Sequence, residues 1–265
     1  MGPANGRNPK SSIHERERDA DRAVKMRTTE TSTIPKSARR LGVVITAGPT
    51  QEPIDEVRFI GNRSSGGLGI AFAEAACARG HSVTLLLGPI PAREPDDVGR
   101  SLTGIRTHGS VHRFRTTDDL ARLLDAHSAE ADVIVMIAAV ADYRPKQGSA
   151  NGKIRRADGG LTLELESTPD LLAGLGRNRR AGQLLVGFAL EPRERLLESA
   201  RRKLERKAID LIVANPLETM ESCEIEATVL GKNGQEFATE GRVTKKEFAP
   251  WLLDIIERAS ASMTA

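Results

Sequence analysis

The stretch from Val43 to Gly69 constrains the fold of this chain more than any other part of it. It begins with Val43, Val44 and Ile45, whose β-branched apolar side chains are typical of a buried parallel strand. It ends in the glycine-rich run SSGGLG, and the alanine-rich residues that follow predict a helix. A strand, a glycine-rich turn and a helix present backbone N–H groups to a phosphate in α/β proteins. The stretch therefore predicts an open α/β sheet with an anion-binding turn.

A long polar segment, rather than a tight turn, joins this strand to the glycines. An open α/β sheet binds its ligand at the carboxyl edge of its strands, so we expect a ligand site here. The glycines alone are equally consistent with a helix N-cap packed closely on the strand, because short glycine motifs are weak signals. The polar residues of the segment are Thr50, Gln51, Glu52, Asp55, Arg58, Asn62 and Arg63.

The rest of the chain alternates between apolar runs of strand length and amphipathic runs of helix length. This alternation predicts an α/β fold of the Rossmann-like type, a doubly wound and mainly parallel sheet. A flap hairpin is expected where residues 154–156 pair with 161–166 across Asp158-Gly159-Gly160, and a short C-terminal β-hairpin, a candidate dimer contact, at 226–238. Further strands are expected at 81–89, 104–114, 132–140, 184–189 and 209–215, and helices beginning near residues 70, 117, 168, 193 and 244.

The charge of the chain is unevenly distributed. Residues 1–40 hold 10 of the 39 basic and 5 of the 36 acidic side chains, which leaves 29 basic and 31 acidic ones in residues 41–265. The sequence pI near 9.0 therefore comes from the tail, and nucleic-acid binding is not expected. Residues 1–40 lack apolar periodicity and are predicted to be a disordered basic tail, whereas residues 41–265 are predicted to form one Rossmann-like domain.

The sequence shows no apolar run of transmembrane length and no signal-peptide pattern. Its two cysteines, Cys77 and Cys223, lack metal-ligand spacing, which favours a reduced protein. We therefore expect a cytoplasmic protein without a membrane partner.

Several short motifs follow one another in a fixed order: Thr46-Ala47-Gly48-Pro49-Thr50, Glu52-Pro53-Ile54-Asp55, Val57-Arg58, Asn62 and Ser64-Ser65-Gly66. Together they resemble the signature of phosphopantothenoylcysteine synthetase, the phosphopantothenate–cysteine ligase of coenzyme A biosynthesis. The resemblance runs from about Gly42 to about Glu257. It implies that residues 41–265 are a ligase domain that joins 4′-phosphopantothenate and L-cysteine, after CTP activates the carboxylate as an acyl-cytidylate.

The resemblance also implies cofactors and partners. CTP is the expected co-substrate, Mg2+ the expected cation and a homodimer the expected assembly. The family is often fused behind a flavin-dependent decarboxylase. No flavin is expected in this chain, and a separate phosphopantothenoylcysteine decarboxylase is a candidate partner.

The resemblance assigns roles to single residues. Asn62 and Lys153 are the candidate catalytic residues, since Asn62 would hold the oxygens of the acyl intermediate and Lys153 would contact nucleotide phosphates. The candidate substrate-binding residues are Arg58, Asn62, Ala138 and Ala139, with Arg58 reaching the substrate phosphate across a dimer interface. The metal ligands are not identified. The candidate nucleotide-binding residues are Gly48, Ser64, Gly66, Gly69, Met136, Ile137, Ala138, Asp142, Lys153, Pro169, Asp170, Leu171, Leu172, Phe188, Lys203 and Lys207.

Taken alone, these residue types leave alternatives open. Asp142 follows an apolar strand and could bind a ribose, a base or a metal ion, or simply cap a turn. Phe188 could stack on a base or pack structurally, and Lys153 could be a solvated surface lysine. Lys203 and Lys207 share one face of a predicted helix, as an i,i+4 pair does.

This chain departs from the family pattern at Gln51, Gly67, Pro216 and residues 220–225. A catalytically diverged nucleotide-binding relative, with a scaffolding or regulatory role, is therefore the alternative function. The preference for CTP over ATP is also open. A nicotinamide oxidoreductase is disfavoured, because the glycines lack G-x-G-x-x-G spacing and no acid ends the strand near Leu87. A P-loop ligase is excluded, because the sequence has no GxxxxGK[ST] motif.

Overall fold

The computed structural model describes residues 39–90, 95–146, 152–156 and 160–264. Within them, one sheet of eight strands has the order β13-β12-β10-β9-β6-β1-β4-β5. The run from β10 to β5 is parallel, and the β12–β13 hairpin extends the sheet by antiparallel pairing. The strands are β1 (Gly42–Ala47), β4 (Ser82–Leu87), β5 (Gly109–Arg113), β6 (Val133–Met136), β9 (Leu184–Glu191), β10 (Leu211–Pro216), β12 (Thr228–Gly231) and β13 (Glu236–Ala238).

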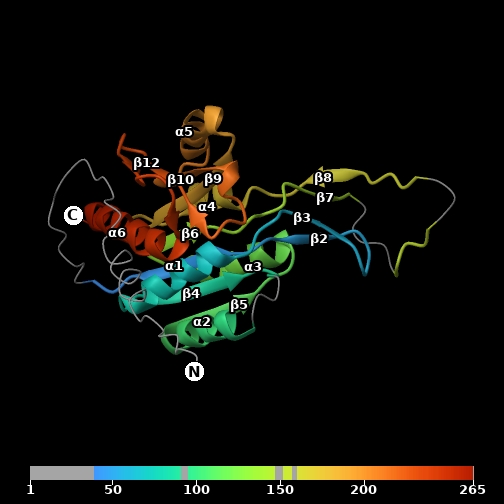
Figure 1. Ribbon diagram of the computed structural model, residues 1–265, viewed down its shortest axis with the longest axis horizontal. Coiled ribbons are helices and arrows are strands. Elements are labelled where there is room, and N and C mark those ends of the chain that lie inside the picture. The colour runs from blue at the N-terminus through green and yellow to red at the C-terminus, as the bar shows by residue number, and fades with distance from the viewer. Residues whose placement is uncertain (1–38, 91–94, 147–151, 157–159, 265) are drawn as a thin grey trace, which may run out of the picture.

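Helices cover both faces of this sheet (Figure 1). One face carries α1 (Gly67–Ala78), α2 (Pro95–His108) and α6 (Lys245–Thr264). The other carries α3 (Thr117–His127), α4 (Leu171–Asn178) and α5 (Leu196–Arg206), and the short 3-10 helices are η1 (Arg193–Arg195) and η2 (Leu217–Thr219). In β1, Val43 and Ile45 join the first apolar core and Val44 joins the second, because successive side chains of a strand point to opposite faces. The predicted doubly wound, mainly parallel sheet is confirmed.

A long arm projects from the body of the molecule (Figure 1). It contains the β2–β3 pair, Gln51–Pro53 with Phe59–Gly61, and the β7–β8 pair, Tyr143–Pro145 with Leu165–Ser167. The predicted pairing of residues 154–156 with 161–166 is wrong, because β8 pairs with β7 and residues 154–156 form no strand. The base of the flap is therefore the β7–β8 pair. Asp158 and Gly159 of the predicted turn lie outside the described residues.

Other local predictions shift by a few residues. The strand expected at 104–114 is helical up to His108, and only Gly109–Arg113 pairs in the sheet. Helix α3 begins after the N-cap Thr116 rather than Thr117, and α4 begins after Asp170 rather than Thr168. At the start of α6 the predicted capping box is present. Glu247 accepts the Thr244 N–H at 2.9 Å, and the Thr244 hydroxyl accepts the Glu247 N–H at 3.2 Å.

Two further parts complete the description. A small sheet pairs β11 (Glu224–Ile225) with β14 (Val243–Thr244) beside the carboxyl end of the main sheet. The predicted tail, residues 1–40, lies outside the described residues except for Arg39 and Arg40. In the part of the chain that the structure describes, no helix has the length and apolar character needed to cross a membrane.

Candidate functional site

A cleft of about 600 Å3 opens at the carboxyl ends of β1 and β6. These neighbouring strands mark the point where the strand order reverses, since the chain runs from β1 to β4 on one side and returns to β6 on the other. Open α/β sheets bind ligands at such a switch point. The predicted site residues that line the cleft are Gly48, Asn62, Ser64, Gly66, Gly69, Met136, Ile137, Ala138, Ala139, Asp142, Pro169, Asp170, Leu171, Leu172, Phe188, Lys203 and Lys207.

The glycine-rich turn brings the first turn of α1 to the floor of the cleft. Gly66 caps the helix with a φ of 69°, a left-handed conformation that favours glycine. Gly69 allows the helix to lie against β1, because a Cβ there would be 2.4 Å from the Cβ of Ala47. The N-cap Gly66 has no side chain to cap α1, and the first turn holds no acidic residue. The Ser65 hydroxyl accepts the Gly67 N–H at 3.4 Å, so the N–H groups of Leu68 and Gly69 are the ones best placed to bind an anion in the cleft.

The opposite wall of the cleft is the loop of residues 138–142, which follows β6. Alternate residues of the TAGPT motif accept hydrogen bonds from the backbone N–H groups of this loop. The Thr46 hydroxyl accepts from Ala138 at 3.0 Å, the Gly48 carbonyl accepts from Ala139 at 3.0 Å, and the Thr50 hydroxyl accepts from Ala141 at 2.9 Å.

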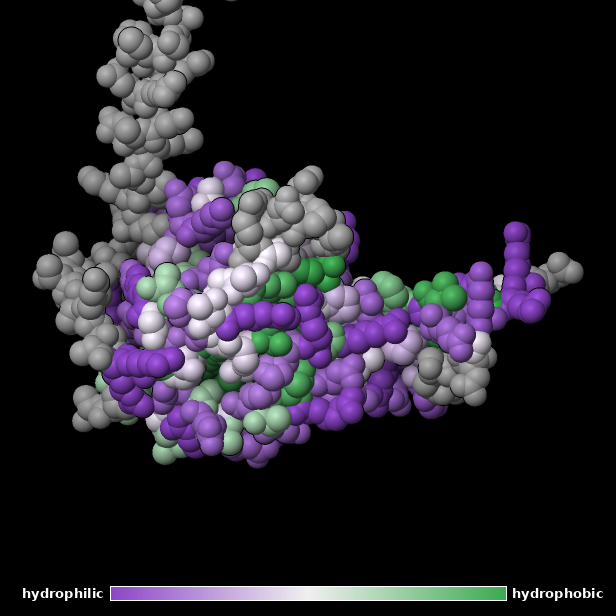
Figure 2. Space-filling model, turned by 90° about the horizontal axis from the view of Figure 1, so that it is seen from below, coloured by the Kyte–Doolittle hydropathy of each residue, from purple (hydrophilic) through white to green (hydrophobic). Residues whose placement is uncertain are grey.

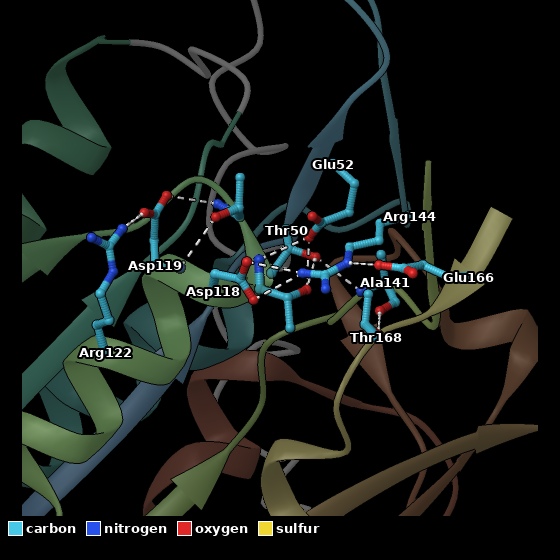
Figure 3. A network of polar contacts seen from close by, with 11 residues as sticks. Thr50, Glu52, Asp118, Asp119, Arg122, Ala141, Arg144, Glu166 and Thr168 are labelled. Carbon is cyan, nitrogen blue, oxygen red and sulfur yellow. Dashed lines mark hydrogen bonds and ion pairs between the residues drawn. The ribbon is translucent and has the colours of Figure 1, made fainter. Parts of the chain in front are cut away.

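The carbonyl groups of the same loop are also bound. The Thr50 N–H donates to Ala139, and the Asn62 side-chain amide donates to the Val140 carbonyl at 2.9 Å. The Thr168 hydroxyl donates to the Ala141 carbonyl. Figure 3 shows Thr50 and Thr168 reaching Ala141 from two separate segments of the chain. The first strand and the loop after β6 therefore form one hydrogen-bonded unit beside the cleft.

Helix α5 contributes cations to the cleft. Lys203 lies 2.9 Å from Glu191, and Lys207 lies 3.0 Å from Asp170. The hydrogen bond from Lys203 lowers the pKa of Glu191. Burial alone would raise the pKa of Asp170, but the Ala173 N–H and Lys207 lower it below the usual value.

Cations outnumber acids along the walls of the cleft. Arg206 also lines the cleft, and no carboxylate within the described residues lies at ion-pair distance from it. A site with this balance is suited to a ligand that carries several negative charges. The cationic residues are Arg63, Lys203, Arg206, Lys207 and Lys245, and the acidic ones are Asp142, Asp170 and Glu221.

The structure does not bring Arg58 and Lys153 to the cleft, because both lie on the arm. Arg58 donates to Asp55 at 2.7 Å and to the Ile154 carbonyl at 3.3 Å. The Ile154 N–H in turn donates to Asp55 at 3.1 Å, so the two candidate residues belong to neighbouring segments of one arm. Burial alone would raise the pKa of Asp55, but the N–H groups that it accepts and the Arg58 guanidinium lower it.

Sequence reasoning did not assign a site role to several residues that line the cleft. Asn215 could have been found, since it stands at the carboxyl end of β10. Of the departures from the family pattern, Gly67 and the segment 220–225 border the cleft, whereas Gln51 and Pro216 do not. In that segment Glu221 lies 3.6 Å from Arg63 on the facing wall. The further lining residues are Arg63, Ser65, Gly67, Leu68, Val140, Ala141, Thr168, Leu190, Arg206, Asn215, Thr219, Met220, Glu221, Ile225 and Lys245.

Few side chains in the cleft are available as metal ligands. Within the described residues, no three His, Cys, Asp or Glu side chains come together as a metal-binding group. Asp142 lines the cleft with an exposed carboxylate. The other two acids of the cleft are paired, Asp170 with Lys207 and Glu221 with Arg63. A single remaining carboxylate fits Mg2+ that takes most of its ligands from phosphates and water, and it does not fit a metal held by protein side chains alone.

Known proteins resemble this chain in sequence and in structure. It matches the family described as DNA/pantothenate metabolism flavoprotein C-terminal domain over residues 38–259. A cysteine/cysteine sulfinic acid decarboxylase of an unknown prokaryotic organism is 43% identical over 188 residues, which are 69% of this chain and 47% of that protein. The coenzyme A biosynthesis bifunctional protein CoaBC of Mycobacterium tuberculosis H37Rv is 41% identical over 210 residues, which are 75% of this chain and 48% of that protein.

A solved structure also resembles the chain. The crystal structure of the C-terminal domain of CoaBC is 35% identical, has a TM-score of 0.65, and covers 84% of this chain and 95% of that chain. The chain spans about half the length of the curated relatives named above. It belongs to the DNA/pantothenate metabolism flavoprotein C-terminal domain family, the phosphopantothenoylcysteine synthetase half of CoaBC.

Proposed function

We propose that this chain joins 4′-phosphopantothenate to L-cysteine and uses CTP to activate the carboxylate. The observation that carries the proposal is the cleft at the switch point, where the α1 N-terminus and the cations of α5 face one space. This arrangement suits a triphosphate, and it occurs in a chain of the ligase family.

The proposed reaction has two steps. A carboxylate oxygen of 4′-phosphopantothenate attacks the α-phosphorus of CTP, and the bond to the leaving pyrophosphate breaks. The cysteine amine then attacks the acyl carbon, which releases CMP and a proton and leaves an amide. Neither step needs a nucleophile from the protein. The protein has to position the reactants, bind the growing negative charge and keep water away from the acyl-cytidylate.

The cleft residues fit these tasks. The first N–H groups of α1 would bind phosphate oxygens, and Lys203, Arg206 and Lys207 would offset their charge. Asn62, beside the loop of residues 138–142, would bind the oxygens of the acyl intermediate. Phe188 would stack on the base. Asp142 would hold Mg2+ together with phosphate oxygens, and the ion would neutralise phosphate charge there.

We propose that the chain acts in the cytoplasm as a homodimer joined through the arm. The exposed apolar side chains gather on the arm, where Val57 is 59% exposed and Leu161 is 61% exposed. Figure 2 shows hydrophobic residues along the arm among hydrophilic ones. The C-terminal hairpin is the weaker candidate for the dimer contact, because its strands continue the main sheet. In such a dimer, Arg58 and Lys153 would reach the cleft of the partner subunit.

Pyrophosphate release tests the activity. With CTP, cysteine and 4′-phosphopantothenate, the protein should release pyrophosphate in step with product, and without 4′-phosphopantothenate it should release none. Replacing CTP by ATP measures the nucleotide preference. CTP binding without pyrophosphate release would support the alternative, a diverged relative that binds nucleotide, since Gly67 and residues 220–225 border the cleft.

Light scattering tests the assembly. Leu161→Glu places a charge on the arm and should convert a dimer into a monomer. The matched control is Leu217→Glu, because Leu217 is also apolar and exposed, at 40%, but lies away from the arm. A wild-type monomer, or equal dissociation of both variants, would contradict a dimer joined through the arm.

A further inference from the structure

The TAGPT motif is bound to the loop of residues 138–142 rather than directed only at a ligand. Thr46 and Thr50 are fully buried, and each hydroxyl accepts a backbone N–H of that loop. A buried N–H without a partner is costly, so these bonds restrict the conformations open to the loop. The loop includes Asp142 and forms one wall of the cleft.

A second layer of polar contacts fixes Thr50 itself. Its hydroxyl lies 3.5 Å from that of Thr117, the first residue of α3. The N–H and hydroxyl of Thr117 both donate to the buried carboxylate of Glu52, at 2.8 and 2.7 Å. Figure 3 shows Thr50 and Glu52 of this cluster near Ala141. Hydrogen-bonded networks of this kind restrict the rotamers of their members, so the Thr50 hydroxyl is held where it meets the Ala141 N–H.

The other peptide group of Ala141 is tied to the arm. Thr168 donates to the Ala141 carbonyl, and Arg144, two residues after Asp142, binds both Asp118 of α3 and Glu166 of β8. Ala141 is thus held on both sides by the body of the protein and by the base of the arm. The direction in which the chain enters Asp142 is therefore fixed by Thr50 on one side and Thr168 on the other.

We infer that Thr50, assisted by Thr46, is a positioning residue for nucleotide binding, acting through the loop of residues 138–142. This inference rests on the proposed function, since it takes CTP as the occupant of the cleft. Thr50 would not itself contact the nucleotide. It sets the place of the wall that carries Ala138, Ala139 and Asp142, so its loss should weaken CTP binding without removing any group that contacts CTP.

The test compares four proteins: the wild type, Thr50→Val, Thr50→Ser and Thr239→Val. Valine keeps the shape of threonine but cannot accept the Ala141 N–H, whereas serine can. Thr239, which is 9% exposed, is a matched control because its hydroxyl also accepts a buried backbone N–H, that of Ala227 at 3.1 Å. Thr239 does not line the cleft.

Two measurements separate a positioning role from a merely structural one. The first is amide hydrogen exchange of the segment 138–142 without ligand, which Thr50→Val should accelerate and the other two variants should not. The second is the dissociation constant of CTP. It should rise on the order of tenfold in Thr50→Val, by the cost of one unpaired buried N–H, and stay within about twofold in Thr50→Ser and Thr239→Val.

The outcomes decide the inference in either direction. Unchanged exchange in Thr50→Val would show that Thr50 does not hold the loop. Faster exchange with unchanged CTP affinity would show that the position of the loop does not matter for the nucleotide. An equal rise of the CTP dissociation constant in Thr239→Val would show that the rise in Thr50→Val reflects general destabilisation. A wild-type protein that binds no CTP would contradict the proposed function instead, and the exchange comparison, which needs no ligand, still decides whether Thr50 holds the loop.

Discussion

The amino and carboxyl edges of the parallel sheet use similar polar residues in different ways. At the amino edge, the residue directly before a strand accepts an N–H from the start of a neighbouring strand. His81, before β4, accepts from Leu41 at 3.3 Å, and Asp132, before β6, accepts from Gly42 at 2.8 Å. Asp210, before β10, accepts from Leu185 at 2.9 Å. These side chains fix how the strands meet.

The same amino-edge residues are paired with charged groups of the protein itself. Asp210 binds both Arg179 and Lys232, and it is only 3% exposed. His81 lies 2.8 Å from Glu257 of α6. The polar groups named at this edge are thus paired with one another within the fold.

At the carboxyl edge, the protein satisfies the loop backbone and pairs Lys203 and Lys207 with acids, but Arg206 and the start of α1 are left facing the cleft. Thr46 and Thr50 bind the loop after β6, while the first N–H groups of α1 face the cleft. Arg206 has no carboxylate at ion-pair distance among the described residues. This difference predicts that substitutions at the amino edge should mainly lower stability, and that substitutions at the carboxyl edge should mainly lower activity. The predictions below test this division.

The largest predicted change in free energy concerns the amino edge. Asp210→Ala leaves two cations and the Leu185 N–H without their acceptor, so the free energy of unfolding should fall by about 3–5 kcal/mol, as for other broken buried ion pairs. Urea unfolding measures it. Ligase turnover per folded molecule should be unchanged. The matched variant at the carboxyl edge, Asp142→Asn, should lose activity and keep its stability; the opposite pattern would abolish the proposed division.

The second effect is expected at Asn62 in the cleft. Asn62→Asp places a negative charge beside the proposed acyl intermediate and should slow turnover on the order of 10²-fold, as the loss of an oxyanion donor does. The free energy of unfolding should change little, because Asn62 is exposed. Asn62→Ala also loses the donor and the bond to Val140 but adds no charge, so any extra slowing in the Asp variant measures the effect of the added charge. An Asp variant within twofold of the wild type would remove Asn62 from the mechanism.

A third and smaller effect is expected on the arm. Lys153→Gln should slow the formation of acyl-cytidylate roughly tenfold, because its charge would offset that on the α-phosphoryl oxygens while the carboxylate attacks. The later attack by cysteine should be nearly unchanged, since pyrophosphate has then left. Single-turnover measurements of the two steps, first without and then with cysteine, separate them. Arg155→Gln, on the same described segment, serves as the charge-matched control. Equal slowing of both steps would mean that Lys153 has no specific role.

The sequence predicted the sheet well because its strands carry their own signal. The β-branched run of β1 and the apolar run of β6 need no knowledge of distant residues to be found. Helix α2 was mispredicted because Gly99 and Gly104 weaken its local helix propensity. The parallel pairing of β4 with β5 requires a crossover connection between them, and α2 forms it. The flap failed for a related reason, since alternation identifies a strand but not its partner.

The cleft was predicted more completely than the arm. Gly66, Asn62, Asp142 and Phe188 come together because parallel strands end at one edge, and that rule can be applied to a sequence. Arg58 and Lys153 could not be placed in this way, because their position depends on how the arm lies relative to a cleft. The bond between Thr50 and Ala141 was also out of reach, since it joins residues 91 positions apart.

The smallest effect concerns pH and an ion pair of the carboxyl edge. The folded-state pKa of Asp170 is lowered, so its carboxylate stabilises the fold above its unfolded pKa of about 3.9, and this stabilisation is lost as the pH falls through the lower folded-state value. Asp170→Asn keeps an acceptor for the Ala173 N–H but removes the pair with Lys207.

At pH 7 the wild type should be more stable than Asp170→Asn by only about 0.5 kcal/mol, because the Asp170 side chain is 42% exposed and water screens the pair. The difference should shrink as the pH falls through the lowered folded-state pKa of Asp170 and vanish below it, where both proteins carry a neutral side chain at this position. Thermal unfolding of both proteins from pH 7 to pH 2.5 measures it. A difference at pH 7 as large as that of Asp210→Ala would mean that the carboxyl edge also carries stability, and the division between the two edges would fail.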